Sequence, residues 1–210
     1  IVGRTDRMTP VFSGNMSYIV INPWWETPIS IARRDKLPKF RSDPDAIRRL
    51  GFEILDRSGH EVDAGDIDWH KVRASNFPFR LRQKPGPQNA LGQVKLMFPN
   101  AHAVYLHDTP SRSLFSRSRR DFSSGCVRVE RVMDLAAWAL QGNADWDRER
   151  IDRTVAEGTE TTVSLSRRIP VHLMYMTAVR GADGKVHFLD DIYDRDSRLI
   201  EALHRPSGRA

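Results

Sequence analysis

Short apolar runs separated by polar turns dominate the pattern along the chain and predict strands. Three of these runs are rich in β-branched and aromatic residues: MSYIVI (16–21), QVKLMF (93–98) and AVYLH (103–107). Near the C-terminus, IPVHLMYMTAV and KVHFL flank GADG at 181–184, which predicts a β-hairpin with a four-residue loop. The opening stretch, to about Asn22, is also expected to be β.

Helical spacing is confined to a few segments. Apolar residues at 132–140 fall on one helical face, and Gly142 follows as a natural C-terminal cap. Two further helices are expected at 147–157 and in DRDSRLIEALH at 194–204. The pattern therefore predicts a mostly β domain that carries a few helices, an α+β fold.

The segment 23–78 has a different character, with several prolines, two adjacent tryptophans and many charges. One helix is signalled in it, because Asp43 can cap it, Pro44 suits its first turn and Gly51 can end it. The rest is expected to be irregular and is too long for an ordinary connection. We therefore expect a subdomain inserted into one domain that covers 1–210. Its larger aromatic residues are candidates for packing or for substrate walls: Trp24, Trp25, Trp69 and Phe77.

The composition excludes several classes of protein. A hydrophobic share of 40% and a charged share of 29% are typical of a globular domain. The single cysteine cannot form an intrachain disulfide. No HExxH pattern or phosphate-binding glycine loop is present, so neither a metal nor a cofactor is expected. The longest apolar helical run, LAAWAL at 135–140, is too short to span a membrane.

The net charge of +6 permits an anionic partner such as nucleic acid, a membrane surface or a carboxylate-rich polymer. A solvated basic surface is the alternative. The aromatic-interleaved pattern of nucleic-acid modules is missing, so no nucleic acid partner is expected. Four arginines in one loop either attract such a polymer or are merely solvated: Arg112, Arg117, Arg119 and Arg120. Because the chain does not begin with Met, we expect a trimmed piece whose parent has further regions upstream.

Candidate chemistry concentrates at 102–131. His107 ends a strand and Cys126 begins the next one, 19 residues later, so a folded-back loop can bring the two side chains together. A free thiol is only partly ionised at neutral pH, and an adjacent imidazole can take its proton. Gly125 allows unusual backbone dihedrals, so the N–H groups of this turn can converge on a developing oxyanion. The alternative is that Cys126 is a small buried hydrophobe and His107 a core histidine.

YLHDTP (105–110) followed by SSGCVRV (123–129) resembles the signature of the L,D-transpeptidase catalytic domain, the YkuD-type family. The resemblance covers essentially all of 1–195, including the opening IVGRTDRMTP. It implies a YkuD-type β-sandwich in which 23–78 forms a capping subdomain over the cleft, as in the larger Gram-negative branch.

The resemblance also implies roles for individual residues. Cys126 would be the nucleophile and His107 its base, with the backbone amides of Ser124, Gly125 and Cys126 as the oxyanion hole. Three further residues would lie at the substrate site: Tyr105, Asp108 and Arg128. For Arg128, holding the loop is the alternative to binding a substrate carboxylate. Many members have His where this chain has Ser124, which leaves the mechanism intact but bears on fine positioning.

The reaction implied by the resemblance joins peptidoglycan stems in the periplasm. A thioester on Cys126 would form with release of D-Ala, and meso-diaminopimelate of a second tetrapeptide stem would resolve it to a 3→3 cross-link. Resolution by water would make the same site an L,D-carboxypeptidase. Carbapenem-type β-lactams would acylate the cysteine, and contact with the membrane would run only through an N-terminal anchor upstream. The rival classes are a polyanion-binding module and a wall-binding domain without activity.

Overall fold

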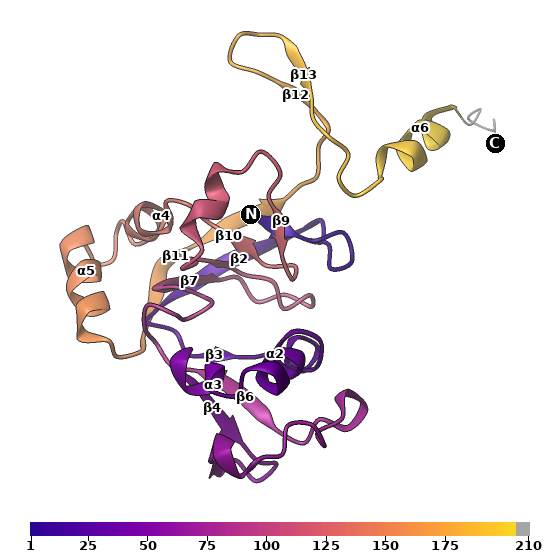
Figure 1. Ribbon diagram of the computed structural model, residues 1–210. Helices are drawn as coiled ribbons and strands as arrows, with labels where there is room; N and C mark the ends of the chain where they lie inside the picture. The colour runs from indigo at the N-terminus through magenta and orange to yellow at the C-terminus, as the bar shows by residue number, and fades with distance from the viewer. Residues whose placement is uncertain (205–210) are drawn as a thin grey trace.

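The central element of the computed structural model, which describes residues 1–204, is a five-stranded sheet (Figure 1). Its strands, in spatial order, are β10 (Val127–Arg128), β8 (Leu106–His107), β7 (Val94–Met97), β2 (Phe12–Ile21) and β11 (Thr161–Leu173). All neighbours are antiparallel except β8 and β10, which run parallel. A separate parallel pair joins β1 (Val2–Gly3) to β9 (Asp121–Ser123). The predicted α+β fold is confirmed.

Two helices pack their apolar faces against this sheet. They are α4 (Val132–Ala139) and α5 (Arg148–Glu157), and they share a core with residues of β2, β7 and β11. Both confirm the predicted helices. Helix α5 starts where the Asp147 carboxylate accepts a hydrogen bond from the N–H of Arg150 at 2.7 Å. It ends at Gly158, whose φ of 72° is the left-handed conformation that glycine adopts without strain.

The inserted segment has a sheet and a core of its own (Figure 1). The antiparallel sheet has the order β3 (Trp25–Glu26), β6 (Arg80–Gln83), β4 (Phe52–Leu55) and β5 (Glu61–Val62). The segment also holds α1 (Ile29–Ile31), a π-helical turn (Ala32–Lys36), α2 (Leu37–Ser42), α3 (Ala46–Arg49) and 3-10 turns at Ala64–Asp66 and Ala74–Asn76. Strand β6 lies beyond residue 78, and the core reaches Leu91. We call the unit from Trp25 to Leu91 the inserted subdomain.

Two expectations for this segment were wrong. Asp43 does not begin a helix: its N–H donates to the Lys39 carbonyl at the end of α2, and α3 starts later, with Asp45 at its N-cap. The stretch 29–42, expected to be irregular, is helical throughout. Trp25, Trp69 and Phe77 are buried in the second core, while the half-buried Trp24 stacks under the Arg82 guanidinium at 4.7 Å.

The C-terminal part projects from the main sheet (Figure 1). The predicted hairpin is formed by β12 (Ala178–Arg180) and β13 (Val186–Phe188), although its loop has five residues, and α6 (Asp196–His204) follows. The apolar run expected to form the first hairpin strand is divided, because residues up to Leu173 belong to β11 instead. A further 3-10 turn, Arg112–Ser116, lies in the loop between β8 and β9.

Candidate active site

The parallel pair β8–β10 brings His107 and Cys126 to one face of the sheet. Leu106 pairs with Val127 and His107 with Arg128. The N–H of Val127 also donates to the Tyr105 carbonyl at 3.1 Å, which extends the pairing to the residue before each strand. Paired residues in a parallel ladder point to the same side, and side chains alternate along each strand.

One face of this strand pair therefore carries four chemically active side chains: Tyr105, His107, Cys126 and Arg128. The loop of 18 residues between His107 and Cys126 is closed by backbone pairing. The sequence pattern could only show that His107 and Cys126 each lie where a strand meets a loop.

His107 is buried, with only 5% of its surface exposed. Its Nδ1 lies 2.5 Å from the Asp108 carbonyl oxygen, and a carbonyl can only accept, so Nδ1 carries the proton and Nε2 holds the lone pair. Burial, helped by the positive charge of Arg128, lowers the pKa of His107 to about 4, against the effect of the Asp108 and Leu91 carbonyls. The imidazole is therefore neutral at pH 7 and available as a base.

Cys126 is a half-buried free thiol. Burial raises its pKa, and the backbone and hydroxyl of Tyr105 and the charge of Arg128 oppose this effect. The thiol also faces the Ala103 carbonyl at 3.9 Å. No hydrogen bond between the thiol and His107 is formed within residues 1–204, although catalytic contacts of this kind often tighten only when substrate binds. The resting pair is neutral imidazole with neutral thiol.

Tyr105 connects the thiol to the inserted subdomain. Its side chain packs against both hydrophobic cores, and its ring lies edge-on to that of His107 at 5.7 Å. Its hydroxyl is close enough to the Cys126 thiol and the Trp25 side chain to interact with both, and burial together with the thiol raises the pKa of Tyr105. The hydroxyl is therefore a neutral donor that can stabilise a thiolate.

The turn before the nucleophile is held by hydrogen bonds on both sides. The Ser123 hydroxyl donates to the Cys126 carbonyl at 2.5 Å and accepts from the Gly125 N–H at 3.2 Å. Gly125 has φ of 115°, a conformation that other residues rarely adopt. The Thr9 hydroxyl donates to its carbonyl at 2.9 Å. Because the Gly125 N–H already has a partner, the amides of Ser124 and Cys126 are the better candidates for an oxyanion hole.

Comparison with known proteins gives this geometry a family. Residues 1–163 match the family model of the L,D-transpeptidase catalytic domain, YkuD. This chain belongs to that family. The resemblance seen in the sequence is thus confirmed, and with it the YkuD-type fold.

A relative with a similar sequence is a Haemophilus influenzae protein named "Putative L,D-transpeptidase". It is 41% identical over 199 residues, which cover 95% of this chain and 40% of the relative. The chain thus spans about two-fifths of the length of the curated relative that it matches.

Asp108 and Arg128, both predicted at the substrate site, differ in the contacts that they make within the L,D-transpeptidase domain. The buried Asp108 carboxylate accepts from the Gln93 N–H at 3.0 Å and pairs with Arg112 at 2.8 Å, so its contacts are internal. Arg128 exchanges backbone hydrogen bonds with Ile1, both at 2.9 Å. Burial lowers the pKa of its guanidinium, and no carboxylate within the described chain pairs with it. The side chain of Arg128 is thus the one suited to an external anion, and its substrate role stays a prediction.

The arginines of the loop between base and nucleophile are largely engaged within the domain. Arg112 binds Asp108 and also the Glu130 carbonyl. Arg119 forms two hydrogen bonds with the Asp121 carboxylate, at 2.8 and 2.9 Å. These contacts are internal and form without a substrate. Attraction of substrate by this loop therefore remains a prediction.

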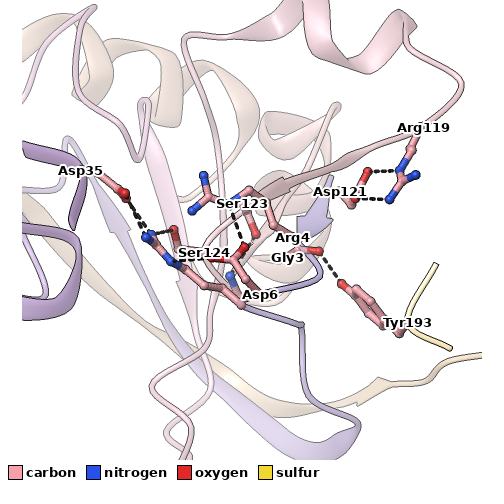
Figure 2. A network of polar contacts seen from close by, with 11 residues as sticks. Gly3, Arg4, Asp6, Asp35, Arg119, Asp121, Ser123, Ser124 and Tyr193 are labelled. Atoms are coloured by element: carbon pink, nitrogen blue, oxygen red, sulfur yellow. Dashed lines mark hydrogen bonds and ion pairs between the residues drawn. The ribbon is translucent and has the colours of Figure 1, made fainter. Parts of the chain in front are cut away.

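A polar network around the nucleophile turn had no signal in the sequence (Figure 2). The Arg7 guanidinium binds Asp35 of the inserted subdomain and the Ser124 hydroxyl. On the opposite side, the Tyr193 hydroxyl donates to the Gly3 carbonyl at 2.6 Å (Figure 2). Arg7 is 117 positions from Ser124, and Tyr193 is 190 positions from Gly3, so only the tertiary structure could reveal these contacts.

Neither a metal centre nor a membrane span is found in the described part of the L,D-transpeptidase domain. Residues 1–204 hold no group of three metal-ligating side chains. None of the helices in that range is long and apolar enough to cross a bilayer. A hollow of about 730 Å³ between α4 and the start of α5 is lined by Trp138, Trp146 and neighbouring residues and lies outside the His107–Cys126 face.

Proposed function

We propose that this domain forms 3→3 cross-links between peptidoglycan stems through a thioester on Cys126. The observation that carries the proposal is the common face of Tyr105, His107, Cys126 and Arg128 on the pair β8–β10. This face brings together a thiol, a neutral base and a guanidinium that has no carboxylate partner in residues 1–204. These are the groups that acyl transfer from an anionic peptide needs.

In the first step, His107 Nε2 takes the thiol proton while Sγ attacks the carbonyl carbon of the third stem residue. The carbonyl oxygen becomes an oxyanion, for which the N–H groups of Ser124 and Cys126 are the proposed donors. Collapse breaks the peptide bond to D-Ala, whose amine leaves with the proton from His107. The acyl group remains on Cys126 as a thioester, and no cofactor is needed to balance this step.

In the second step, the side-chain amine of meso-diaminopimelate on another stem attacks the thioester carbonyl. Neutral His107 accepts the proton that this amine loses, the C–S bond breaks, and the sulfur recovers the proton as a thiol. Attack by water instead releases a tripeptide, which is L,D-carboxypeptidation. Because both outcomes share the acyl-enzyme, their ratio is a property of the acceptor site.

Arg128 is proposed to bind a carboxylate of the donor stem. Its guanidinium lies on the nucleophile's face and has a buried Nε without a partner within the described residues. An Arg–carboxylate contact can be bidentate, which would orient the stem as well as attract it. The site is proposed to operate in the periplasm, where peptidoglycan is assembled, as part of a longer protein with an N-terminal anchor.

The test incubates wild-type protein with disaccharide-tetrapeptides and follows products and intact mass. We expect an acyl adduct with loss of D-Ala and a cross-linked dimer, and an adduct with a carbapenem. Cys126→Ala should give neither, and His107→Gln should acylate about 10²–10⁴-fold more slowly. His102→Gln, at an exposed histidine, is the matched control.

Tripeptide without dimer would favour the carboxypeptidase. If the wild-type protein forms no adduct, dimer or tripeptide, the proposed chemistry is wrong. Salt-sensitive binding of a polyanion that ignores Cys126→Ala would then favour a binding module.

A further inference from the structure

The contact between Arg7 and Asp35 joins the inserted subdomain to the nucleophile turn. Figure 2 labels the two residues that it connects, Asp35 and Ser124. Arg7 Nη1 and Nη2 donate to the two carboxylate oxygens of Asp35 at 2.6 and 2.9 Å. The same Nη1 donates to the Ser124 hydroxyl at 2.9 Å. Ser124 lies two residues before Cys126, so one guanidinium touches both the subdomain and the turn that presents the thiol.

Asp35 is held firmly by its surroundings. It belongs to the π-helical turn Ala32–Lys36, and the side chains of Ala32 and Leu37, on either side of it, are buried in the second core. Single π-helical turns inside helices are frequent at functional sites. A shift of the inserted subdomain would therefore carry the Asp35 carboxylate with it.

Arg7, at the other end of the contact, also lies in a segment that is held by hydrogen bonds. Arg7 belongs to the segment between Gly3 and Thr9, which is closed by a hydrogen bond from the Gly3 N–H to the Thr9 hydroxyl at 2.8 Å. Thr9 also holds the Gly125 carbonyl. The segment thus contacts the turn at two successive residues, Ser124 through Arg7 and Gly125 through Thr9.

Burial distinguishes this ion pair from those on the surface. Only 13% of the Arg7 side chain and 35% of the Asp35 side chain are exposed, against 59% and 41% for Arg49 and Asp43. The bidentate geometry and the reduced exposure favour a defined arrangement. Without the Asp35 charge, the only carboxylate left near the guanidinium within the described residues would be that of the exposed Asp6, 3.7 Å from its Nε.

We propose that Arg7 and Asp35 are positioning residues that fix the Ser124–Cys126 turn relative to the inserted subdomain. When the subdomain contacts a donor stem, the same bonds set the amides that face the oxyanion. This inference rests on the proposed function for its effect on acyl transfer, but the coupling itself is a property of the folded chain.

The test compares Asp35→Asn and Ser124→Ala, singly and together, with the matched control Asp43→Asn. Asp35→Asn should slow acylation by a tetrapeptide about tenfold, because small misplacements of reacting groups are costly. Alkylation of Cys126 by iodoacetamide, which uses no oxyanion hole, should change less than about twofold. The double variant should be no slower than the slower single variant, because both changes break one chain of contacts through Arg7.

Amide exchange of the peptide covering 122–126 gives a readout that does not depend on activity. We expect about tenfold faster exchange in Asp35→Asn and no change in Asp43→Asn. The inference would be overturned if Asp35→Asn showed the same amide exchange and acylation rates as the Asp43→Asn control. It would also be overturned if the effects of Asp35→Asn and Ser124→Ala multiplied in the double variant. Failure of the wild-type protein to react with the tetrapeptide would refute the proposed function instead, and the exchange data would still decide the coupling.

Discussion

Replacing Tyr105 by Phe should make the Cys126 thiol harder to ionise. The phenolic hydroxyl is one of three influences that oppose the rise in thiol pKa caused by burial, together with the Tyr105 backbone and the charge of Arg128. A hydrogen bond to a charged group contributes about 1.5–3 kcal/mol, and one pKa unit corresponds to about 1.4 kcal/mol. Tyr105→Phe should therefore raise the thiol pKa by about one to two units.

The assay is the rate of iodoacetamide alkylation as a function of pH. Below the thiol pKa the rate follows the thiolate fraction, so at neutral pH it should fall about tenfold for each unit of the rise. Tyr18→Phe, at a tyrosine of β2, is the control and should leave the profile unchanged. The variant leaves Trp25 with one contact fewer, so its thermal unfolding must be measured alongside. An unchanged or lower thiol pKa in a folded Tyr105→Phe protein would refute the reasoning.

Three further outcomes are expected. The pKa of His107 is about 4 in the folded protein and about 6.5 in an unfolded chain, so the unfolded state binds more protons between these values. The free energy of unfolding should therefore fall by about 3 kcal/mol from pH 6.5 to pH 4. Urea unfolding of His107→Gln should show a smaller loss over the same pH range. Gly92→Ala should destabilise the fold by more than about 1 kcal/mol, because φ is +63° and the new Cβ would collide with the Asp108 side chain; an unshifted melting temperature would contradict this. Ile151→Ala should cost about 2–4 kcal/mol by leaving a cavity under α5, whereas Glu149→Ala on its exposed side should cost under about 0.5 kcal/mol in chemical denaturation.

The parts of the fold that were predictable depend on local patterns. Helix α5 was predicted at 147–157, and its signals lie within its own sequence, because Asp147 caps its start and Gly158 ends it. Helix α2 was missed because the prolines and charges of the segment 23–78 favoured irregular structure. Pro38 follows the π-helical turn directly, where the Leu37 N–H donates to the Ala32 carbonyl five residues back, so the regular i→i−4 pattern is already interrupted where the proline lacks its N–H. The π-helical turn before it also shifts the apolar spacing away from the regular 3.6 period.

The site was predictable to the extent that its residues are close in sequence. His107 and Cys126 belong to one strand–loop–strand unit, so their meeting could be expected. The roles of Asp108 and Arg7 could not, because each depends on a partner brought by another part of the chain. Asp108 would suit a substrate site by its position, yet its carboxylate is taken up by Gln93 and Arg112.

The long-range contacts around the nucleophile turn affect when the site can form during folding. The hydrogen bonds Thr9–Gly125, Arg7–Ser124, Ile1–Arg128 and Tyr193–Gly3 join residues 116, 117, 127 and 190 positions apart. Contacts of such separation close large loops and form late. On a ribosome, a chain that ends before Tyr193 lacks the hydroxyl that donates to the Gly3 carbonyl and accepts from the Thr9 N–H. We expect the thiol to reach its final setting only when synthesis of the domain is almost complete, which would keep unfinished chains from reacting.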